Sequence, residues 1–219
     1  MDFIYIKSGV TALIISVLFT PLLIYLSKKK GFFASIDHRS SHLHETPNTG
    51  GIILCFSVII PLLLYSTYSD QEEFSLLLSA FAVLLITGII DDFNPIPVFY
   101  KFIGQFVPAI VIVLSVEAQH LIIPFLSDYL EIPLFFNYLF WIFFIVISIN
   151  AFNLIDGIDG LAISLGIVGG IYYLIKFIEL GQTNLVIFDI SLIGGLGGLL
   201  FYNFNHKYKI FIGDTGSLF

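Results

Sequence analysis

The sequence predicts an all-α protein, a polytopic membrane helix bundle with about seven transmembrane helices in 219 residues. The chain is 58% hydrophobic with a mean hydropathy of +0.99, and only 11% of its residues are charged, whereas water-soluble domains carry about 25%. Its apolar residues also form runs close to the roughly 20 residues that span a bilayer. We therefore expect one integral membrane domain, 1–219, embedded in a lipid bilayer. The net charge of −7 argues against a nucleic-acid partner.

Long apolar runs place the expected helices in order. The first run is followed by three lysines and by no small-residue cleavage site, so we interpret it as a retained span and not as a signal peptide. Segment 117–133 mixes charges and prolines with apolar residues, which is typical of a connection along the membrane interface. The expected spans are Gly9–Leu26, Gly51–Tyr68, Phe74–Ile90, Phe99–Val116, Leu134–Ile149, Leu161–Phe177 and Leu185–Tyr202.

Two glycine pairs and one cysteine lie within these spans. Gly166 with Gly170, and Gly194 with Gly198, have the four-residue spacing that permits close helix–helix approach, so we expect them to serve packing. Cys55 is the only cysteine, which excludes a disulfide within the chain and a cysteine-based metal site. We expect it to be a small core residue.

Basic residues give the expected orientation. Seven of the nine Lys and Arg fall in alternate connections, while the other connections hold acids and no Lys or Arg. The positive-inside rule then places the basic connections in the cytoplasm and the N-terminus outside. The cytoplasmic loops expected to form a site are 27–50, 91–101, 150–160 and 203–219. The seven basic residues are Lys28, Lys29, Lys30, Arg39, Lys101, Lys207 and Lys209.

Three clusters with aspartates lie where apolar runs end, and all three fall on this cytoplasmic side. They are Asp91-Asp92, the string 150–160 and Gly213-Asp214-Thr215-Gly216-Ser217. Carboxylates are costly beside hydrocarbon, so their presence there is a functional hypothesis. Together they could form one polyanionic site that binds a metal ion.

Asp91 and Asp92 admit two interpretations. They could simply end a helix at the water interface, but acids at a helix C-terminus oppose the helix dipole. Adjacent carboxylates can instead bind a divalent cation or form an acid/base pair with separated pKa values. Lys101 could neutralise a phosphate or pair with these acids.

The other segments are less decisive alone. Asn150, Asn153, Asp156 and Asp159 recur every three residues, a series that drifts by about 60° per step, so they cannot share one helical stripe. Glycines within the string indicate that the backbone leaves regular helix, and a plain interfacial loop is the alternative. Asp214 lies in a string common in turns. In loop 27–50, three histidines could bind zinc, but the nearby acid and arginine suit phosphate and ribose contacts equally, and a plain solvated loop is a third interpretation.

In combination, these residues resemble the polyprenyl-phosphate N-acetylhexosamine-1-phosphate transferases. The resemblance rests on Asp91-Asp92, on 150–161 and on 213–217, and the stretch 39–51 is similar to the first cytoplasmic loop of the O-antigen and N-acetylglucosamine branch. The family implies Mg²⁺, with Mn²⁺ as an alternative, as cofactor. It implies transfer of N-acetylhexosamine 1-phosphate from a UDP-sugar to undecaprenyl phosphate, with release of UMP, at the start of cell-envelope polysaccharide synthesis.

The resemblance also implies roles and a location. It implies a multi-pass protein of the bacterial cytoplasmic (inner) membrane with its site on the cytoplasmic side, and a homodimer is one state that it allows. Asn153 and Asp214 would contact the metal. Asp91, Asp92, Asp156 and Asp159 would be catalytic, and Arg39, His42, Lys101 and Asn150 would bind substrate.

Two departures and two alternatives accompany this resemblance. The family has a basic residue near Asn48, and its members continue for several spans beyond the third cluster, so we expect 1–219 to correspond to the N-terminal two thirds of a longer transferase and to be weak or inactive alone. An ion- or proton-coupled transporter would also place carboxylates in glycine-interrupted spans. An intramembrane aspartyl protease is less consistent, because Phe211 replaces a signature glycine.

Overall fold

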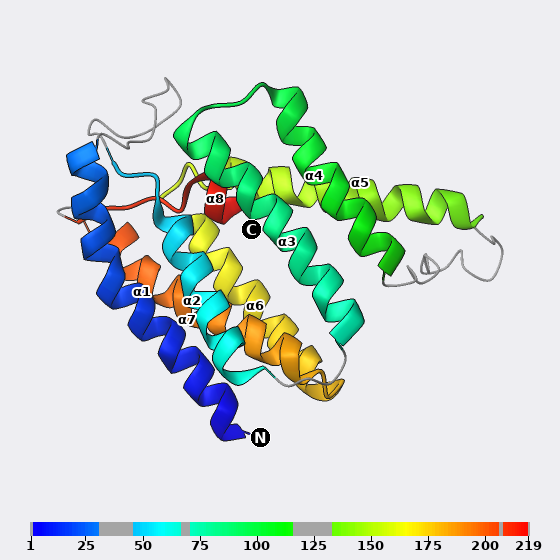
Figure 1. Cartoon of the computed structure of the whole chain (residues 1–219), viewed down its shortest axis with the longest axis horizontal. Coiled ribbons are helices and arrows are strands. Elements are labelled where there is room, and N and C mark those ends of the chain that lie inside the picture. The colour runs from blue at the N-terminus through cyan, green and yellow to red at the C-terminus, as the bar shows by residue number, and fades with distance from the viewer. Residues whose placement is uncertain (1, 31–45, 67–70, 116–132, 206–207, 219) are drawn as a thin grey trace.

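The computed structural model describes residues 2–30, 46–66, 71–115, 133–205 and 208–218, and within these ranges its regular structure is helical (Figure 1). Seven long helices are followed by one short helix near the end of the chain. The helices are α1 (Asp2–Lys30), α2 (Gly50–Tyr65), α3 (Gln71–Phe93), α4 (Val98–Ser115), α5 (Leu134–Ile155), α6 (Leu161–Glu179), α7 (Thr183–Asn203) and α8 (Gly213–Ser217).

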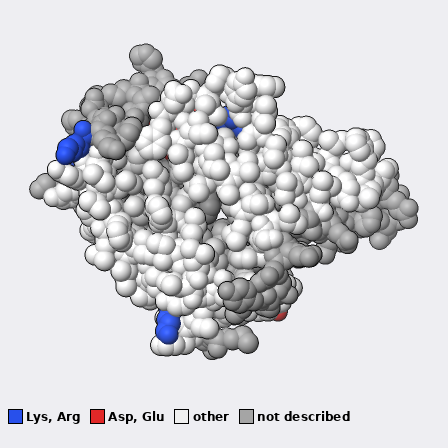
Figure 2. Space-filling view, in the orientation of Figure 1, with Lys and Arg blue, Asp and Glu red and all other residues white. Residues whose placement is uncertain are grey.

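The long helices have the character of membrane spans. Five of those described, α1, α3, α5, α6 and α7, are long and apolar enough to cross a bilayer, and α2 and α4 are shorter apolar helices. Figure 2 shows a face on which charged side chains are rare. The prediction of an all-α, multi-pass membrane protein is confirmed.

Helix α7 lies at the centre of a tightly packed group with α1, α2 and α6. Glycines permit its contact with α1: a Cβ atom added at Gly198 would lie 2.5 Å from the Ser16 hydroxyl oxygen, and Ser16 donates a hydrogen bond to the Gly195 carbonyl at 2.8 Å. Tyr202 also donates to a backbone carbonyl of α1. The expected packing role of the glycine pairs is confirmed, and Cys55 is buried as expected.

Helix α5 lies at the edge of the bundle, away from the packed group around α7. Helix α5 packs mainly on α4, has few contacts with α6, and extends away from the other helices (Figure 1). Only 6% of the most apolar stretch of α5 is buried inside the protein, compared with 56% of the corresponding stretch of α7. The cluster-bearing ends of α3 and α5 nevertheless converge on α8.

All four expected loops prove partly helical, which corrects their boundaries. In the loop 27–50, α1 continues to Lys30. Helix α3 continues to Phe93, so Asp91 and Asp92 lie in its last turn and not in a loop 91–101, and α5 continues to Ile155 through most of the expected loop 150–160. The fourth loop, 203–219, contains α8. A helix satisfies its backbone hydrogen bonds internally and can therefore extend past the apolar run. Hydropathy marks the end of the run and not the end of the helix.

Candidate functional site

The short helix α8 is wedged between α2 and α3, and two glycines make room for it. A Cβ atom added at Gly88 of α3 would lie 2.6 Å from the Thr215 Cα atom, and one added at Gly51 of α2 would collide with the Gly216 backbone. Backbone hydrogen bonds from Gly50 and Gly51 to the segment before α8 complete this fit. Close backbone approach of this kind requires glycine.

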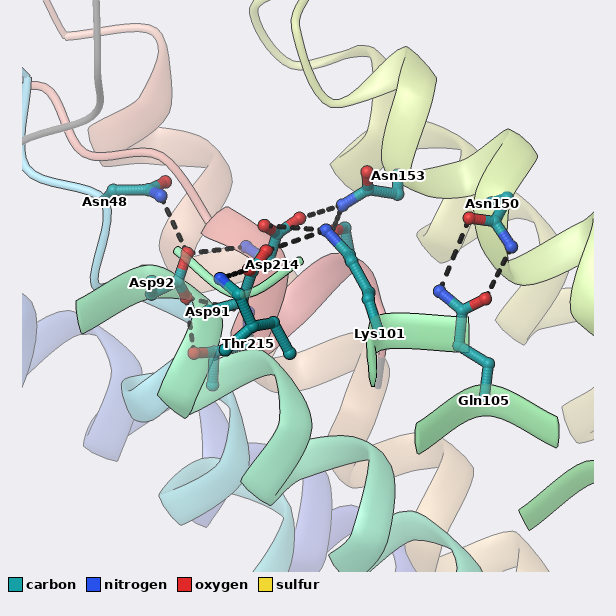
Figure 3. A network of polar contacts seen from close by, with 11 residues as sticks. Asn48, Asp91, Asp92, Lys101, Gln105, Asn150, Asn153, Asp214 and Thr215 are labelled. Atoms are coloured by element: carbon teal, nitrogen blue, oxygen red, sulfur yellow. Dashed lines mark hydrogen bonds and ion pairs between the residues drawn. The ribbon is translucent and has the colours of Figure 1, made fainter. Parts of the chain in front are cut away.

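Asp92 holds the start of α8 in place (Figure 3). Its carboxylate accepts hydrogen bonds from the backbone N–H groups of Asp214 at 2.9 Å and Thr215 at 2.8 Å, and also from the Thr215 hydroxyl. A fourth hydrogen bond, at 2.8 Å, comes from the side-chain amide of Asn48. The left-handed φ of +68° at Gly213 turns the chain into α8 beside this carboxylate. Asp92 therefore fixes the position of Asp214.

The carboxylates of Asp91 and Asp214 both pair with the side chain of Lys101. The Lys101 ammonium lies 2.9 Å from an oxygen of each carboxylate and so links α3, α4 and α8 (Figure 3). The other oxygen of Asp91 accepts a hydrogen bond from the Ile96 backbone N–H at 2.9 Å. Lys101 thus pairs with the acids, the second of the two roles that its sequence position suggested.

Helix α5 contributes Asn153 to the same site. Its side-chain amide donates to an oxygen of Asp214 and, at 2.7 Å, to the Ser217 hydroxyl. Asp156 follows at the end of α5. Burial, together with the negative charges of Asp214 and Asp92, raises the pKa of Asp156 to about 8, although a hydrogen bond from the Gly213 backbone opposes this rise. Burial also raises the pKa of Asp214 above its ordinary value.

The remaining predicted residues lie beside this centre. Asn150 faces α4, where it exchanges two hydrogen bonds with Gln105, at 2.6 and 3.4 Å. Asp159 pairs with Lys209 at 2.5 Å. Arg39 and His42 lie outside the described residues.

Asn203 connects the backbone around the site. Its side chain accepts a hydrogen bond from the Gly160 N–H at 2.6 Å and donates one to the Ile210 carbonyl at 2.9 Å. It therefore ties the turn after Asp156 to the segment that leads into α8. Asn203 is the last residue of α7, so this helix end is joined to both segments.

Sequence reasoning missed most partners of the acids. The string that contains Thr215 gives this residue no role, and neither Gln105, in the middle of α4, nor Ser217, at the end of α8, stands out in the sequence. Asn48 stands out in the sequence only because the family has a basic residue near this position. Its contact with Asp92 spans 44 residues of sequence, and that of Thr215 spans 123, so no local pattern could have revealed them.

The donor set fits a hard divalent cation. Among the described residues no group of three His, Cys, Asp or Glu side chains is arranged to hold a metal by itself. Magnesium, however, is usually held by one or two carboxylates, several waters and substrate phosphates. Burial and, after it, the negative charge of Asp214 raise the pKa of Asp156. A bound dication would offset the repulsion between these two carboxylates, and Asp214, Asp156 and the Asn153 amide oxygen are the groups that would hold it once Asp214 exchanges its present partners, Lys101 and the Asn153 amide N–H.

Comparison with known proteins places the chain in a family. Residues 74–219 match the model of glycosyl transferase family 4. The chain is 32% identical over 216 residues to a probable undecaprenyl-phosphate N-acetylglucosaminyl 1-phosphate transferase of Bacillus subtilis (strain 168), covering 98% of this chain and 58% of that protein. It is 34% identical over 239 residues to a phospho-N-acetylmuramoyl-pentapeptide-transferase of Staphylococcus aureus (strain MW2), covering all of this chain and 73% of that protein. The chain therefore belongs to glycosyl transferase family 4.

Proposed function

We propose that the protein transfers N-acetylhexosamine 1-phosphate from a UDP-sugar to undecaprenyl phosphate and releases UMP. The observation that carries this proposal is the meeting of Asp214, Lys101, Asn153 and Asp156, which come from α8, α4 and the end of α5. Carboxylates that can hold a dication, with an ammonium group among them, can neutralise the negative charge of a diphosphate. Both relatives are named as transferases of phosphorylated sugars, which supports the same reaction class.

The proposed chemistry needs little covalent help from the protein. An oxygen of the lipid phosphate attacks the sugar-bound phosphorus of the UDP-sugar, the bond from that phosphorus to the bridging oxygen breaks, and UMP leaves with the bridging oxygen. The second pKa of a phosphate monoester is about 6, so the attacking group is already ionised at neutral pH. Such transfers depend mainly on positioning and charge neutralisation.

Roles follow from this geometry. Asp214, Asp156 and Asn153 would hold Mg²⁺, or Mn²⁺, which when bound neutralises charge on the diphosphate. Lys101 would leave its position between Asp91 and Asp214 to contact a phosphate, and Asp91 would hold Lys101 close by.

Five expected roles change in this proposal, including those of Asp91 and Asp156 just given. Asp92 becomes a positioning residue, because its carboxylate is already engaged by four donors from Asn48, Asp214 and Thr215. Asp159 and Asn150 become supports of the site through Lys209 and Gln105.

Location and partners are part of the same proposal. A UDP-sugar is a cytoplasmic metabolite, so the site would face the cytoplasm and the N-terminus would lie outside, in a bacterial inner membrane. The described acids of the site lie at helix ends, whereas a coupled transporter binds near the bilayer midplane. The first relative is considerably longer than this chain, which spans 58% of it. The proposed activity is therefore that of a protein with the relatives' full extent.

The proposal can be tested by a transfer assay in lipid nanodiscs. A protein that carries residues 1–219 and has the full extent of the relatives would be supplied with undecaprenyl phosphate and radiolabelled UDP-N-acetylglucosamine, and lipid-linked label and UMP would be measured with Mg²⁺ or EDTA. We expect transfer that requires the cation and falls at least 100-fold in Asp214→Asn. Glu179→Gln, at the exposed end of α6, is the matched control and should be unchanged. Transfer that persists in both EDTA and Asp214→Asn would contradict the proposal, as would the absence of any transfer.

A further inference from the structure

Gln105, a residue outside the acidic segments, joins α4 to α5 beside the site. It lies in the middle of an apolar helix, and its side chain is fully buried. Its amide accepts a hydrogen bond from the Asn150 amide at 2.6 Å and donates one back at 3.4 Å (Figure 3). A buried amide is costly unless its donors and acceptors are satisfied. The reciprocal pair therefore favours one position of α5 against α4.

Helix α5 depends on such a polar contact more than the other long helices do. It packs mainly on α4 and has few contacts with α6 and α8. In a bilayer, apolar contact alone associates helices only weakly, since lipid tails are as apolar as leucine. Hydrogen bonds join particular atoms, so the contacts of Asn150 and Asn153 fix how α5 is rotated about its axis and where it lies along that axis.

The rotation of α5 determines where its groups lie in the site. Asn153 lies almost one turn after Asn150 and donates a hydrogen bond to Asp214. Asp156 follows almost one turn later, at the end of α5. Because these residues share one rigid helix, a rotation of α5 at Asn150 would also move Asn153 and Asp156 relative to α8.

Helix α4 supports both halves of the site. Lys101 pairs with Asp214 of α8, and Gln105 follows four residues later, so both side chains lie on neighbouring parts of one helix face. We propose that Gln105 is a positioning residue: by pairing with Asn150, it holds α5 where the proposed metal-holding groups of that helix face Asp214. This inference rests on the proposed function, because those groups are the ones expected to hold the dication.

A distance measurement tests the placement of α5. Nitroxide labels would be attached to cysteines introduced at Leu154 of α5 and Leu22 of α1, which are both exposed. The native Cys55 would be replaced by serine. Double electron–electron resonance in nanodiscs then reports how α5 lies relative to the packed group around α7. We expect one narrow distribution of distances in the chain that keeps Gln105 and Asn150.

Three variants give the comparison. Gln105→Leu should broaden or shift the distribution, and the exchanged pair Gln105→Asn with Asn150→Gln, which keeps two facing amides, should narrow it again. Val113→Ala shortens another buried side chain of α4 and is the matched control, which should leave the distribution narrow. A distribution that Gln105→Leu leaves unchanged, that Val113→Ala broadens equally, or that the exchanged pair does not narrow again would overturn the proposal.

Mn²⁺ affinity, measured by electron paramagnetic resonance, tests the consequence for the site. Loss of a residue that supports a metal ligand typically weakens metal binding by about 10–100-fold. We expect about ten-fold weaker binding in Gln105→Leu and unchanged binding in Val113→Ala. Equal affinities in Gln105→Leu and the unsubstituted chain would overturn the proposal even if the distances differ. If the unsubstituted chain binds no Mn²⁺ while the distances respond to Gln105→Leu, the placement of α5 by Gln105 stands and the proposed function fails.

Discussion

Asp92 and Asp189 are both aspartates in apolar helices, but their surroundings are opposite. Asp92 accepts four hydrogen bonds, and they fix a second acidic segment, α8, against α3. One oxygen of Asp189 has no partner among the described residues and lies beside a cavity of about 320 Å³. The contrast shows that hydrogen bonds can fix an aspartate of an apolar helix in place, while another aspartate in the same bundle keeps an unpaired oxygen beside a cavity.

Asp156 falls between Asp92 and Asp189, and its effect on the pH dependence of stability is the largest that we expect. Its pKa of about 8, against an ordinary 3.8, means that the folded state retains a proton that the unfolded state has lost. Its contribution to stability is therefore fully present below about pH 4 and is lost as pH rises through about 8. The full shift corresponds to at most about 6 kcal/mol.

Thermal unfolding in nanodiscs with EDTA measures this effect. We expect the melting temperature to fall from pH 5 to pH 8, to fall less in Asp156→Asn, and to recover when Mg²⁺ is added to the unsubstituted chain at pH 8. If the melting temperature fell equally with pH in the chain and in Asp156→Asn, Asp156 would not be crowded by negative charge.

Asparagine substitution tests the contrast between Asp92 and Asp189 directly. In Asp92→Asn an amide group faces backbone donors, so we expect a loss of about 3 kcal/mol, since hydrogen bonds to charged groups are worth roughly 1.5–3 kcal/mol. Asp189→Asn has no such donors to lose and should leave the isolated chain as stable or more stable. Denaturant unfolding followed by tryptophan fluorescence compares the two, and similar losses would remove the distinction.

Alanine substitution of two helical glycines, Gly88 beside α8 and Gly169 beside the cavity, should have smaller effects on stability. Alanine normally stabilises a helix by about 1 kcal/mol relative to glycine, and Gly169→Ala should do so because its Cβ would meet nothing within 4 Å. Gly88→Ala would place a Cβ atom 2.6 Å from the Thr215 Cα atom. We expect it to destabilise the protein by about 2 kcal/mol, as overpacking does. Melting temperatures that shift in the same direction would contradict the wedged position of α8.

The Gln105–Asn150 pair gives the smallest effect. Asn150→Leu leaves the buried Gln105 amide without this partner and should cost about 1–2 kcal/mol, and Gln105→Leu should cost less because Asn150 is only half-buried and still donates to the Val146 carbonyl. Replacing both should cost less than the two single changes together, with a coupling of about 1 kcal/mol in a double-mutant cycle. Strict additivity would show that the two amides do not depend on each other.

Much of the fold follows from the sequence, because apolar runs of membrane length must become helices. The helix ends do not, since Asp91, Asp92 and Asn153 are polar and yet helical. The three acidic segments could be placed on one side from the distribution of basic residues. Their actual contacts could not be predicted. The space that α8 occupies depends on Gly88, which in the sequence is simply one residue of an apolar run.

The central claim is that acidic segments distant in sequence form one site for a dication that holds a diphosphate. Titration of the chain in nanodiscs with Mn²⁺, followed by electron paramagnetic resonance with and without UDP-N-acetylglucosamine, tests it most directly. The account predicts one bound Mn²⁺ per chain, tighter binding when the UDP-sugar is present, and at least ten-fold weaker binding in Asp214→Asn. Mn²⁺ affinity that is unchanged in Asp214→Asn and indifferent to the UDP-sugar would contradict it.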